Sequence, residues 1–105
     1  MRFGIIGSGE IGALRARAIA AVPAAKLVAV ADRDPVRASV LASRHGCTQH
    51  ADATGLLADP AVEAVIVSTP PPLHREHVLA ALASGRPVLC EKPLAPTVED
   101  CRRMV

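Results

Sequence analysis

The sequence has almost no aromatic residues. Phe3 is the only one, and both tryptophan and tyrosine are absent. Since half of the 105 residues are hydrophobic and 21% are charged, the chain can still fold around a core, and intrinsic disorder is excluded. That core must be aliphatic, as it is in parallel sheets that are buried on both faces. The length suits one domain and not two.

Long apolar runs and long runs of one charge are absent as well. No stretch approaches the roughly 20 apolar residues of a membrane span. The short apolar run at the N-terminus is broken by Gly7 and Gly9, which is unlike a signal peptide. The net charge is +2 and the basic residues are scattered, which argues against a nucleic-acid-binding face. We therefore expect a cytoplasmic protein that binds neither membranes nor nucleic acids.

Metal-binding and disulfide patterns are lacking too. The three cysteines are odd in number and form no C-x-x-C pair, which indicates reduced thiols. His74 and His77 are three residues apart but have no cysteine or carboxylate partner nearby in sequence, so we expect no metal site. His45 and His50 have the pattern of surface residues.

Short apolar runs instead alternate with segments of helical periodicity. We expect buried strands over residues 2–6, 26–31 and 64–68, a further strand over 87–90 and a short edge strand over 47–51. We expect helices over residues 10–22, 35–45, 74–84 and from 97 onward, with one helical turn at 56–57. Asp34 and Pro35 suit the start of the second helix, and Gly46 suits its end. This alternation predicts an α/β fold with a doubly wound parallel sheet in the order 3-2-1-4-5.

Helical spacing also predicts which side chains of the helices face the core. The expected buried positions are Ile11, Leu14, Ala18, Ile19 and Val22 in the first helix, Val36, Val40 and Leu41 in the second, and Val78, Ala81 and Leu82 in the helix over 74–84.

A glycine-rich segment of the form G-x-G-x-x-G links the first strand to the first helix. It consists of Gly7, Ser8, Gly9, Glu10, Ile11 and Gly12. Asp32 follows at the end of the second strand, 20 residues after Gly12. A strand, a helix and an acidic residue in this arrangement are the dinucleotide-binding fingerprint of the Rossmann fold. Gly7 would permit the tight turn, and Gly9 would let a diphosphate approach the backbone.

The charges near Asp32 bear on which dinucleotide is bound. Asp32 can accept hydrogen bonds from the adenosine ribose and would repel a 2′-phosphate, which favours NAD. Arg33 could instead pair with that phosphate, so NADP is possible. A Walker phosphate loop is excluded because no G-K-[ST] follows. A methyltransferase, whose glycine loop and acidic residue look the same, stays open at this point, as does a tight turn without a ligand.

Two later segments fall at the carboxyl ends of strands, where ligands of such sheets bind. The candidate binding residues in them are Ser68, Thr69, Pro70 and His74 after the fourth strand, and Glu91, Lys92 and Pro93 after the fifth. Lys92 is one of only two lysines in an arginine-rich chain. A lysine can lose its proton when it is desolvated, whereas an arginine cannot, so Lys92 is a candidate catalytic residue, and a lysine of a surface loop is the alternative that the sequence leaves open at this point.

Together, the glycine loop, Asp32, the T-P-P-x-x-H segment from Thr69 and the E-K-P segment from Glu91 resemble the Gfo/Idh/MocA dehydrogenases. The resemblance covers essentially all 105 residues but only the first domain of the family. It implies an NAD(P)-dependent oxidoreductase that transfers a hydride at a secondary alcohol or ketone of a sugar or polyol.

The resemblance also implies residue roles. Lys92 would lie near the nicotinamide and the substrate hydroxyl, Glu91 would approach the cofactor ribose, and Pro93 would shape the turn that holds Lys92. The cofactor pocket would be lined by Thr69, Pro70 and His74.

Residues 1–105 are thus expected to be an NAD(P)-binding Rossmann domain without its sixth strand and without the second domain, which would supply most of the pocket for a small sugar-like substrate. Alone it should be inactive, and it is expected to form a homo-oligomer. The alternative is a non-catalytic NAD-binding regulatory or sensor module. Lys92 in its E-K-P setting favours the enzyme, because a sensor would not need it.

Overall fold

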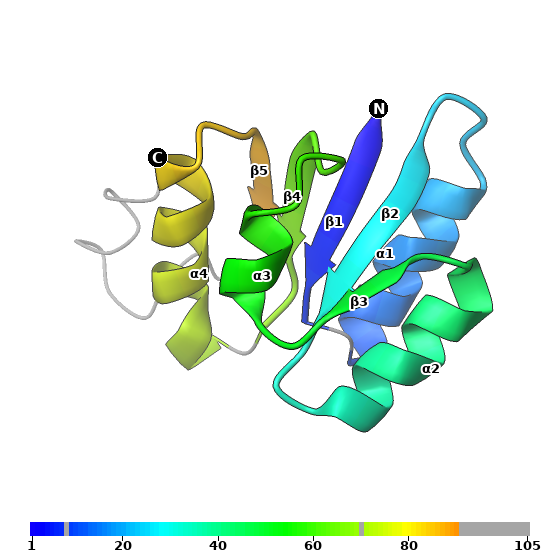
Figure 1. The fold of residues 1–105 in the computed structure, drawn as a ribbon, viewed down its shortest axis with the longest axis horizontal. Helices are drawn as coiled ribbons and strands as arrows, with labels where there is room; N and C mark the ends of the chain where they lie inside the picture. The colour runs from blue at the N-terminus through cyan, green and yellow to red at the C-terminus, as the bar shows by residue number, and fades with distance from the viewer. Residues whose placement is uncertain (8, 70, 91–105) are drawn as a thin grey trace.

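The computed structural model describes residues 1–7, 9–69 and 71–90, and a five-stranded parallel sheet runs through their centre (Figure 1). The strands are β1 (Arg2–Ile6), β2 (Lys26–Ala31), β3 (Thr48–His50), β4 (Ala64–Val67) and β5 (Val88–Cys90). The helices are α1 (Glu10–Ala20), α2 (Pro35–His45), α3 (Ala53–Leu57) and α4 (Pro71–Ala83). The sheet order β3-β2-β1-β4-β5 confirms the predicted doubly wound topology. The helix expected from residue 97 lies outside the described residues.

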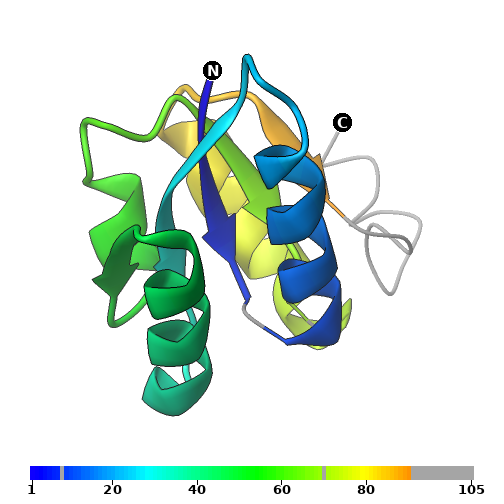
Figure 2. The same cartoon turned by 90° about the vertical axis from the view of Figure 1, so that its right-hand side faces the viewer.

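The sheet is covered on both faces. Figure 2 shows α1 and α3 on opposite sides of β1. Ile5 and Ile6 are both almost fully buried, and they belong to different core clusters because successive strand residues point to opposite faces. Ile5 packs with residues of α1 and α2, and Ile6 packs with residues of α3 and α4. The aliphatic composition therefore serves two cores that share one sheet.

The predicted inner faces of three helices are partly wrong. In α1, Ile11 and Leu14 are 45% and 48% exposed, and Val22 beyond its end is 50% exposed. The buried positions of α1 are instead Gly12, Ala16 and Ile19. Small residues let the helix axis approach the strands closely, so the larger side chains beside them are left at the flanks of the contact.

The same correction applies to α2 and α4. Val36 and Val40 are 69% and 52% exposed, whereas Ala38, Leu41 and Ala42 are the buried residues of α2. Ala18 and Leu82 are exposed as well, while Ile19, Val78 and Ala81 are buried as predicted. The helix starting at 74 in the prediction begins at Pro71, since proline is tolerated in the first turn of a helix.

The ends of α2 are formed as the sequence predicts. The Asp34 carboxylate accepts hydrogen bonds from the backbone N–H groups of Val36, at 2.9 Å, and Arg37, at 3.4 Å. Gly46 ends the helix with φ +63°, in the left-handed region that favours glycine. Beyond it, Cys47 is a free, half-buried thiol, and its burial raises its pKa.

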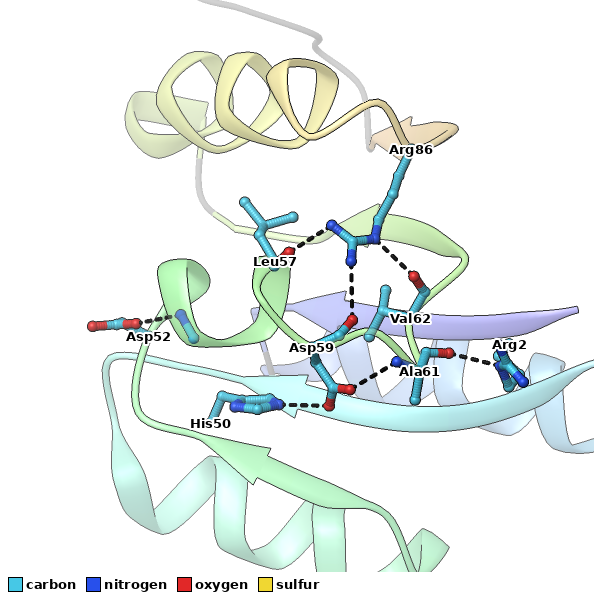
Figure 3. A network of polar contacts seen from close by, with 9 residues as sticks. Arg2, His50, Asp52, Leu57, Asp59, Ala61, Val62 and Arg86 are labelled. Carbon is cyan, nitrogen blue, oxygen red and sulfur yellow. Dashed lines mark hydrogen bonds and ion pairs between the residues drawn. The ribbon is translucent and has the colours of Figure 1, made fainter.

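Arg86 ties together the chain segments that enter β4 and β5 (Figure 3). Its guanidinium donates to the carbonyl oxygens of Val62 at 2.7 Å, Asp59 at 2.9 Å and Leu57. Five N–H donors in a planar fork let one arginine satisfy several carbonyl groups of the same loop. The amino edge of the sheet is thus closed by a side chain from the loop before β5.

Asp59 extends this network towards β3. Its carboxylate accepts a hydrogen bond from the Ala61 backbone and lies 2.9 Å from Nε2 of His50 (Figure 3). The hydrogen bond with His50, followed by that from Ala61, lowers the pKa of Asp59. His50 is therefore half-buried and paired, and not the surface residue that the sequence suggested. We call Arg2, Asp59 and Arg86 the amino-edge network, since Arg2 Nε also donates to the Ala61 carbonyl, at 2.8 Å. Asp59 connects this network to His50, the last residue of β3.

None of the helices in the described part of the chain has the length and apolar character needed to cross a membrane.

Candidate nucleotide-binding site

A cleft of about 920 Å³ opens at the carboxyl edge of the sheet. It is lined by residues at the ends of β1, β2 and β4, and by residues of all four helices. The order of the strands reverses between β1 and β4, and open α/β sheets bind their ligands at such a switch point. The volume suits a ligand of drug or cofactor size.

The turn after β1 forms one wall of the cleft. Gly7 has φ +99°, and its backbone N–H donates to the carbonyl of Ala31 at 2.8 Å. A Cβ at Gly7 would lie 2.8 Å from the carbonyl of Ser68, so both the conformation and the space require glycine here. A Cβ at Gly12 would overlap the carbonyl oxygen of Gly7. The turn and the start of α1 are therefore packed as tightly as the fingerprint requires.

Gly9 differs from both of these glycines. Its φ of −75° is open to any residue, and the nearest atom to a Cβ there would be Nη1 of Arg37, at 3.4 Å. Nothing in the fold demands glycine at this position, yet a side chain there would project into the cleft that Gly9 lines. The lack of a side chain at Gly9 therefore leaves room in the cleft for a ligand.

No side chain among the described residues caps the N-terminus of α1. Asp34 caps α2 and Asp52 caps α3, whereas Gly9 at the N-cap of α1 makes no side-chain hydrogen bond. The first backbone N–H groups of a helix have no partner within the helix and carry about half a positive charge. The open end of α1 therefore offers donors to an anion in the cleft.

The opposite wall carries charge from β2 and α2. Asp32, Arg33 and Arg37 all line the cleft. Asp32 is half-buried and its Oδ1 accepts a hydrogen bond from the Asp34 backbone at 2.8 Å, which fixes the position of the carboxylate. Arg37 is held by an ion pair between its Nε and Oδ2 of Asp34, at 3.3 Å. A carboxylate and two guanidinium groups thus face the end of the cleft beside β2.

Two hydroxyl side chains follow β4. The backbone N–H of Ser68 donates to the Ile6 carbonyl at 2.8 Å, which holds this segment beside β1. Oγ of Ser68 is buried and has no hydrogen-bond partner among the residues that the structure describes. Thr69 is 9% exposed, and its Oγ1 lies 3.1 Å from Nδ1 of His77. A buried hydroxyl without a partner is costly, so Ser68 is suited to a polar ligand in the cleft.

Most of the predicted binding residues that are described come together in this cleft. Those that line it are Gly7, Gly9, Glu10, Ile11, Asp32, Arg33, Ser68 and Thr69. Gly12 does not line the cleft but packs closely against the backbone of Gly7. His74 lies near the start of α4, and its side chain is outside what the structure describes. The predicted site residues outside the described residues are Ser8, Pro70, Glu91, Lys92 and Pro93.

The sequence reasoning missed several polar residues of the cleft. They are Asp34, Arg37, Asp52, Thr54, Glu76 and His77. A signal existed for Arg37, since α2 begins at the carboxyl edge and its first turn must lie there. A signal also existed for His77, which follows His74 by three positions on the same helix face.

The donor set of the cleft fits a dinucleotide. The open turn at Gly9 suits a diphosphate, and the carboxylate of Asp32 suits a ribose diol. Within the described ranges, no group of three or more histidine, cysteine or acidic side chains is placed to hold a metal ion.

Relatives of this chain are dehydrogenases. It is 45% identical to inositol 2-dehydrogenase of Acidothermus cellulolyticus over 107 residues, which cover the whole chain and 31% of the relative. It is 42% identical to inositol 2-dehydrogenase of Ralstonia nicotianae, again over the whole chain and 32% of the relative. The chain thus spans about a third of the length of the curated relatives that it matches.

Solved structures show the same likeness. The myo-inositol dehydrogenase of Lactobacillus casei, in complex with NAD(H) and myo-inositol, superposes with a TM-score of 0.93 at 32% identity, over 99% of this chain and 32% of that one. The WlbA dehydrogenase of Bordetella pertussis, in complex with NADH and UDP-GlcNAcA, gives 0.93 at 32% identity, over 98% and 32%.

A family model described as an oxidoreductase family with an NAD-binding Rossmann fold matches residues 1–105. This match decides against the methyltransferase that the glycine loop alone left open. The chain belongs to the Gfo/Idh/MocA oxidoreductase family and has its NAD-binding Rossmann fold.

Proposed function

We propose that this chain binds NAD(H) in the cleft at the carboxyl edge of its sheet, as the nucleotide-binding domain of an oxidoreductase that acts on a polyol or sugar. The observation that carries the proposal is the turn at Gly9. A backbone that any residue could adopt carries no side chain there. Among the described residues, the neighbouring helix end has no side-chain cap and the Ser68 hydroxyl has no hydrogen-bond partner. These features together suit a diphosphate and have no purpose in the fold itself.

Each part of the cleft then has a partner on the cofactor. The N-terminus of α1 would receive the diphosphate, and Asp32 would accept hydrogen bonds from the adenosine ribose. The same carboxylate repels a 2′-phosphate, which supports a preference for NAD over NADP. Arg33 and Arg37 lie close enough to the same end of the cleft to reduce that preference.

The proposed chemistry depends on residues outside the described part of the chain. The cofactor supplies the hydride donor or acceptor, and the family resemblance gives Lys92 the role of binding or polarising the substrate hydroxyl. We propose a secondary alcohol of a sugar-like polyol as substrate, because the two inositol 2-dehydrogenases above match the whole chain. Since this chain spans about a third of their length, most of the substrate pocket would belong to a second domain. Residence in the cytoplasm and formation of a homo-oligomer stay predictions of the sequence.

The test is a titration of the chain with NADH, followed by fluorescence, in the wild type and in Gly9→Ala. We expect the wild type to bind NADH and Gly9→Ala to bind it at least tenfold more weakly, because the added methyl group occupies the approach of the diphosphate. Circular dichroism should show an unchanged fold, since a Cβ at Gly9 meets only a flexible arginine end at 3.4 Å.

Gly46→Ala is the matched control, because it adds the same methyl group at a glycine with nothing within 4 Å and away from the cleft. It should leave NADH affinity unchanged. A folded wild type that does not bind NADH, or a Gly9→Ala variant that binds like the wild type, would contradict the proposal. Polyol-dependent reduction of NAD by the longer protein would separate an enzyme from a sensor.

A further inference from the structure

The contact between Thr69 and His77 has no part in the function proposed above. Thr69 follows β4, His77 lies in α4, and both side chains line the cleft. Nδ1 of His77 lies 3.1 Å from Oγ1 of Thr69. We propose that His77 is a positioning residue, which holds the Thr69 hydroxyl in the orientation that contacts the bound cofactor. This inference rests on the proposed binding of NAD(H).

Thr69 is placed where its hydroxyl can matter to the cofactor. A Cβ at Gly7 would lie 2.9 Å from the Thr69 backbone nitrogen, so the segment after β4 packs directly on the glycine turn. Thr69 is only 9% exposed and is the buried polar residue of the described core. Its hydroxyl therefore lies next to the turn that is proposed to receive the diphosphate, in a wall that cannot easily move.

The hydrogen bond to His77 removes the rotational freedom of that hydroxyl. A threonine hydroxyl has one donor and two acceptor sites, and Nδ1 occupies one of them. If Nδ1 accepts, the oxygen of Thr69 is left to accept from a cofactor hydroxyl. If Nδ1 donates, the hydroxyl proton of Thr69 is left to donate to a cofactor oxygen. Either tautomer leaves two of the three sites and reduces the orientations open to the hydroxyl before the ligand binds, which lowers the entropy lost on binding.

His77 is well placed for this task because it belongs to a helix of thirteen residues that packs on the sheet through Val78 and Ala81. The contact spans eight positions of sequence and joins that helix to the loop. An imidazole that only filled space would not need Nδ1 directed at a hydroxyl in the cleft. The pair thus couples a rigid element to a binding group.

A double-mutant cycle tests the proposal, with NADH affinity of the chain as the readout. Thr69→Val removes the hydroxyl and keeps the shape, and His77→Ala removes the imidazole. We expect each variant to weaken NADH binding by about threefold to tenfold, the range that corresponds to one hydrogen bond. The double variant should bind no more weakly than Thr69→Val alone, because His77 acts only through that hydroxyl. His77→Asn should restore part of the affinity, since its amide can replace Nδ1.

The control is His50→Ala, which removes another half-buried histidine with a hydrogen bond, at 2.9 Å, that does not line the cleft. It should lower the melting temperature and leave NADH affinity unchanged. The inference is overturned if His77→Ala binds NADH within twofold of the wild type, or if the losses in the double variant multiply. Should His77→Ala not fold, Thr69→Val decides alone, and an NADH affinity equal to that of the wild type would overturn the inference. A wild type that fails to bind NADH instead removes the proposed function itself.

Discussion

The two edges of the sheet differ in how far their polar groups are hydrogen-bonded by the chain itself. At the amino edge, Arg86 satisfies three carbonyl groups, and Asp59 accepts hydrogen bonds from the Ala61 backbone and pairs with His50 (Figure 3). At the carboxyl edge, the helix end at Gly9 has no side-chain cap and Oγ of Ser68 has no partner among the described residues. Both edges are made of loops that join the same strands, so the connections alone do not cause the difference.

The contrast indicates where a ligand belongs. A buried polar group without a hydrogen-bond partner lowers folding stability by about 1–3 kcal/mol. Folded proteins therefore pair such groups with other protein atoms, with water or with a ligand. At the amino edge the chain itself satisfies the polar groups around Arg86 and Asp59, although Nε2 of His45 at the end of α2 is buried without a partner among the described residues. At the carboxyl edge, the helix end at Gly9 and Oγ of Ser68 are suited to a molecule with anionic and hydroxyl groups. A protein that departs from local stability rules does so most often at its functional site.

The largest effect should come from Gly7→Ala, which breaks the carboxyl edge. The variant forces a left-handed φ of +99° on alanine and brings its Cβ to 2.8 Å from the Ser68 carbonyl. We expect the free energy of unfolding to fall by about 3 kcal/mol or more, through strain and overpacking together. Urea unfolding measures the loss, and NADH binding should vanish with it.

Gly46→Ala separates the two causes of that loss. Gly46 also has a left-handed φ, +63°, but nothing lies within 4 Å of its added Cβ. It should cost only about 1 kcal/mol. Equal losses for the two variants would mean that the close approach of Ser68 to Gly7 has no energetic weight.

Arg86→Met should break the amino edge and leave the carboxyl edge intact. The methionine keeps an apolar stem but leaves the carbonyls of Leu57, Asp59 and Val62 without their donor. We expect a loss of about 2–3 kcal/mol in unfolding free energy and an unchanged dissociation constant for NADH. Arg86→Lys should recover little, since an ammonium group lacks the planar fork. A parallel loss of NADH affinity would show that the edges are coupled and the comparison is wrong.

The sequence predicted the fold well because the fold depends on hydrophobic periodicity and on the glycine and proline residues that end helices and strands. The runs at Arg2–Ile6 and Lys26–Ala31 are uninterrupted and aliphatic, and both became strands with the predicted bounds. It predicted burial in the helices poorly, since helical spacing does not say how close the helix approaches the sheet. In α1, Gly12 and Ala16 set that distance, and the larger Leu14 is left 48% exposed.

The site residues that belong to a local sequence motif could be predicted. Those that reach the cleft from an element distant in sequence could not be fully predicted. The glycine turn and Asp32 come from short patterns with a fixed place in the topology. The topology and the helical spacing indicate that the helices of Arg37 and His77 lie near the cleft, but no spacing in the sequence says how far a helical side chain extends towards another loop. The partnership of His50 with Asp59 was hidden for the same reason.

Asp59→Asn should weaken the amino edge in a way that depends on pH. Hydrogen bonds from His50 and Ala61 lower the pKa of Asp59, so its stabilising contribution is complete above the ordinary pKa of an aspartate. That contribution is lost as the pH falls through the lowered value. We expect the variant to be about 1–2 kcal/mol less stable at pH 7, and the gap to narrow progressively below about pH 4. Thermal unfolding of both proteins between pH 7 and 3 measures it, and a gap independent of pH would contradict the pairing.

The smallest effect on stability should come from Gly9→Ser. It tests the comparison most directly, because one substitution should raise folding stability and lower NADH affinity. A serine at this extended N-cap can accept a hydrogen bond from the first turn of α1, as Asp34 does for α2. We expect the chain to become more stable by a few tenths of a kcal/mol, because the helix end is then completed by the protein. NADH affinity should fall at least tenfold, since the side chain takes the place of the diphosphate. Stability and affinity that rise together would mean that the open end of α1 is not kept for a ligand.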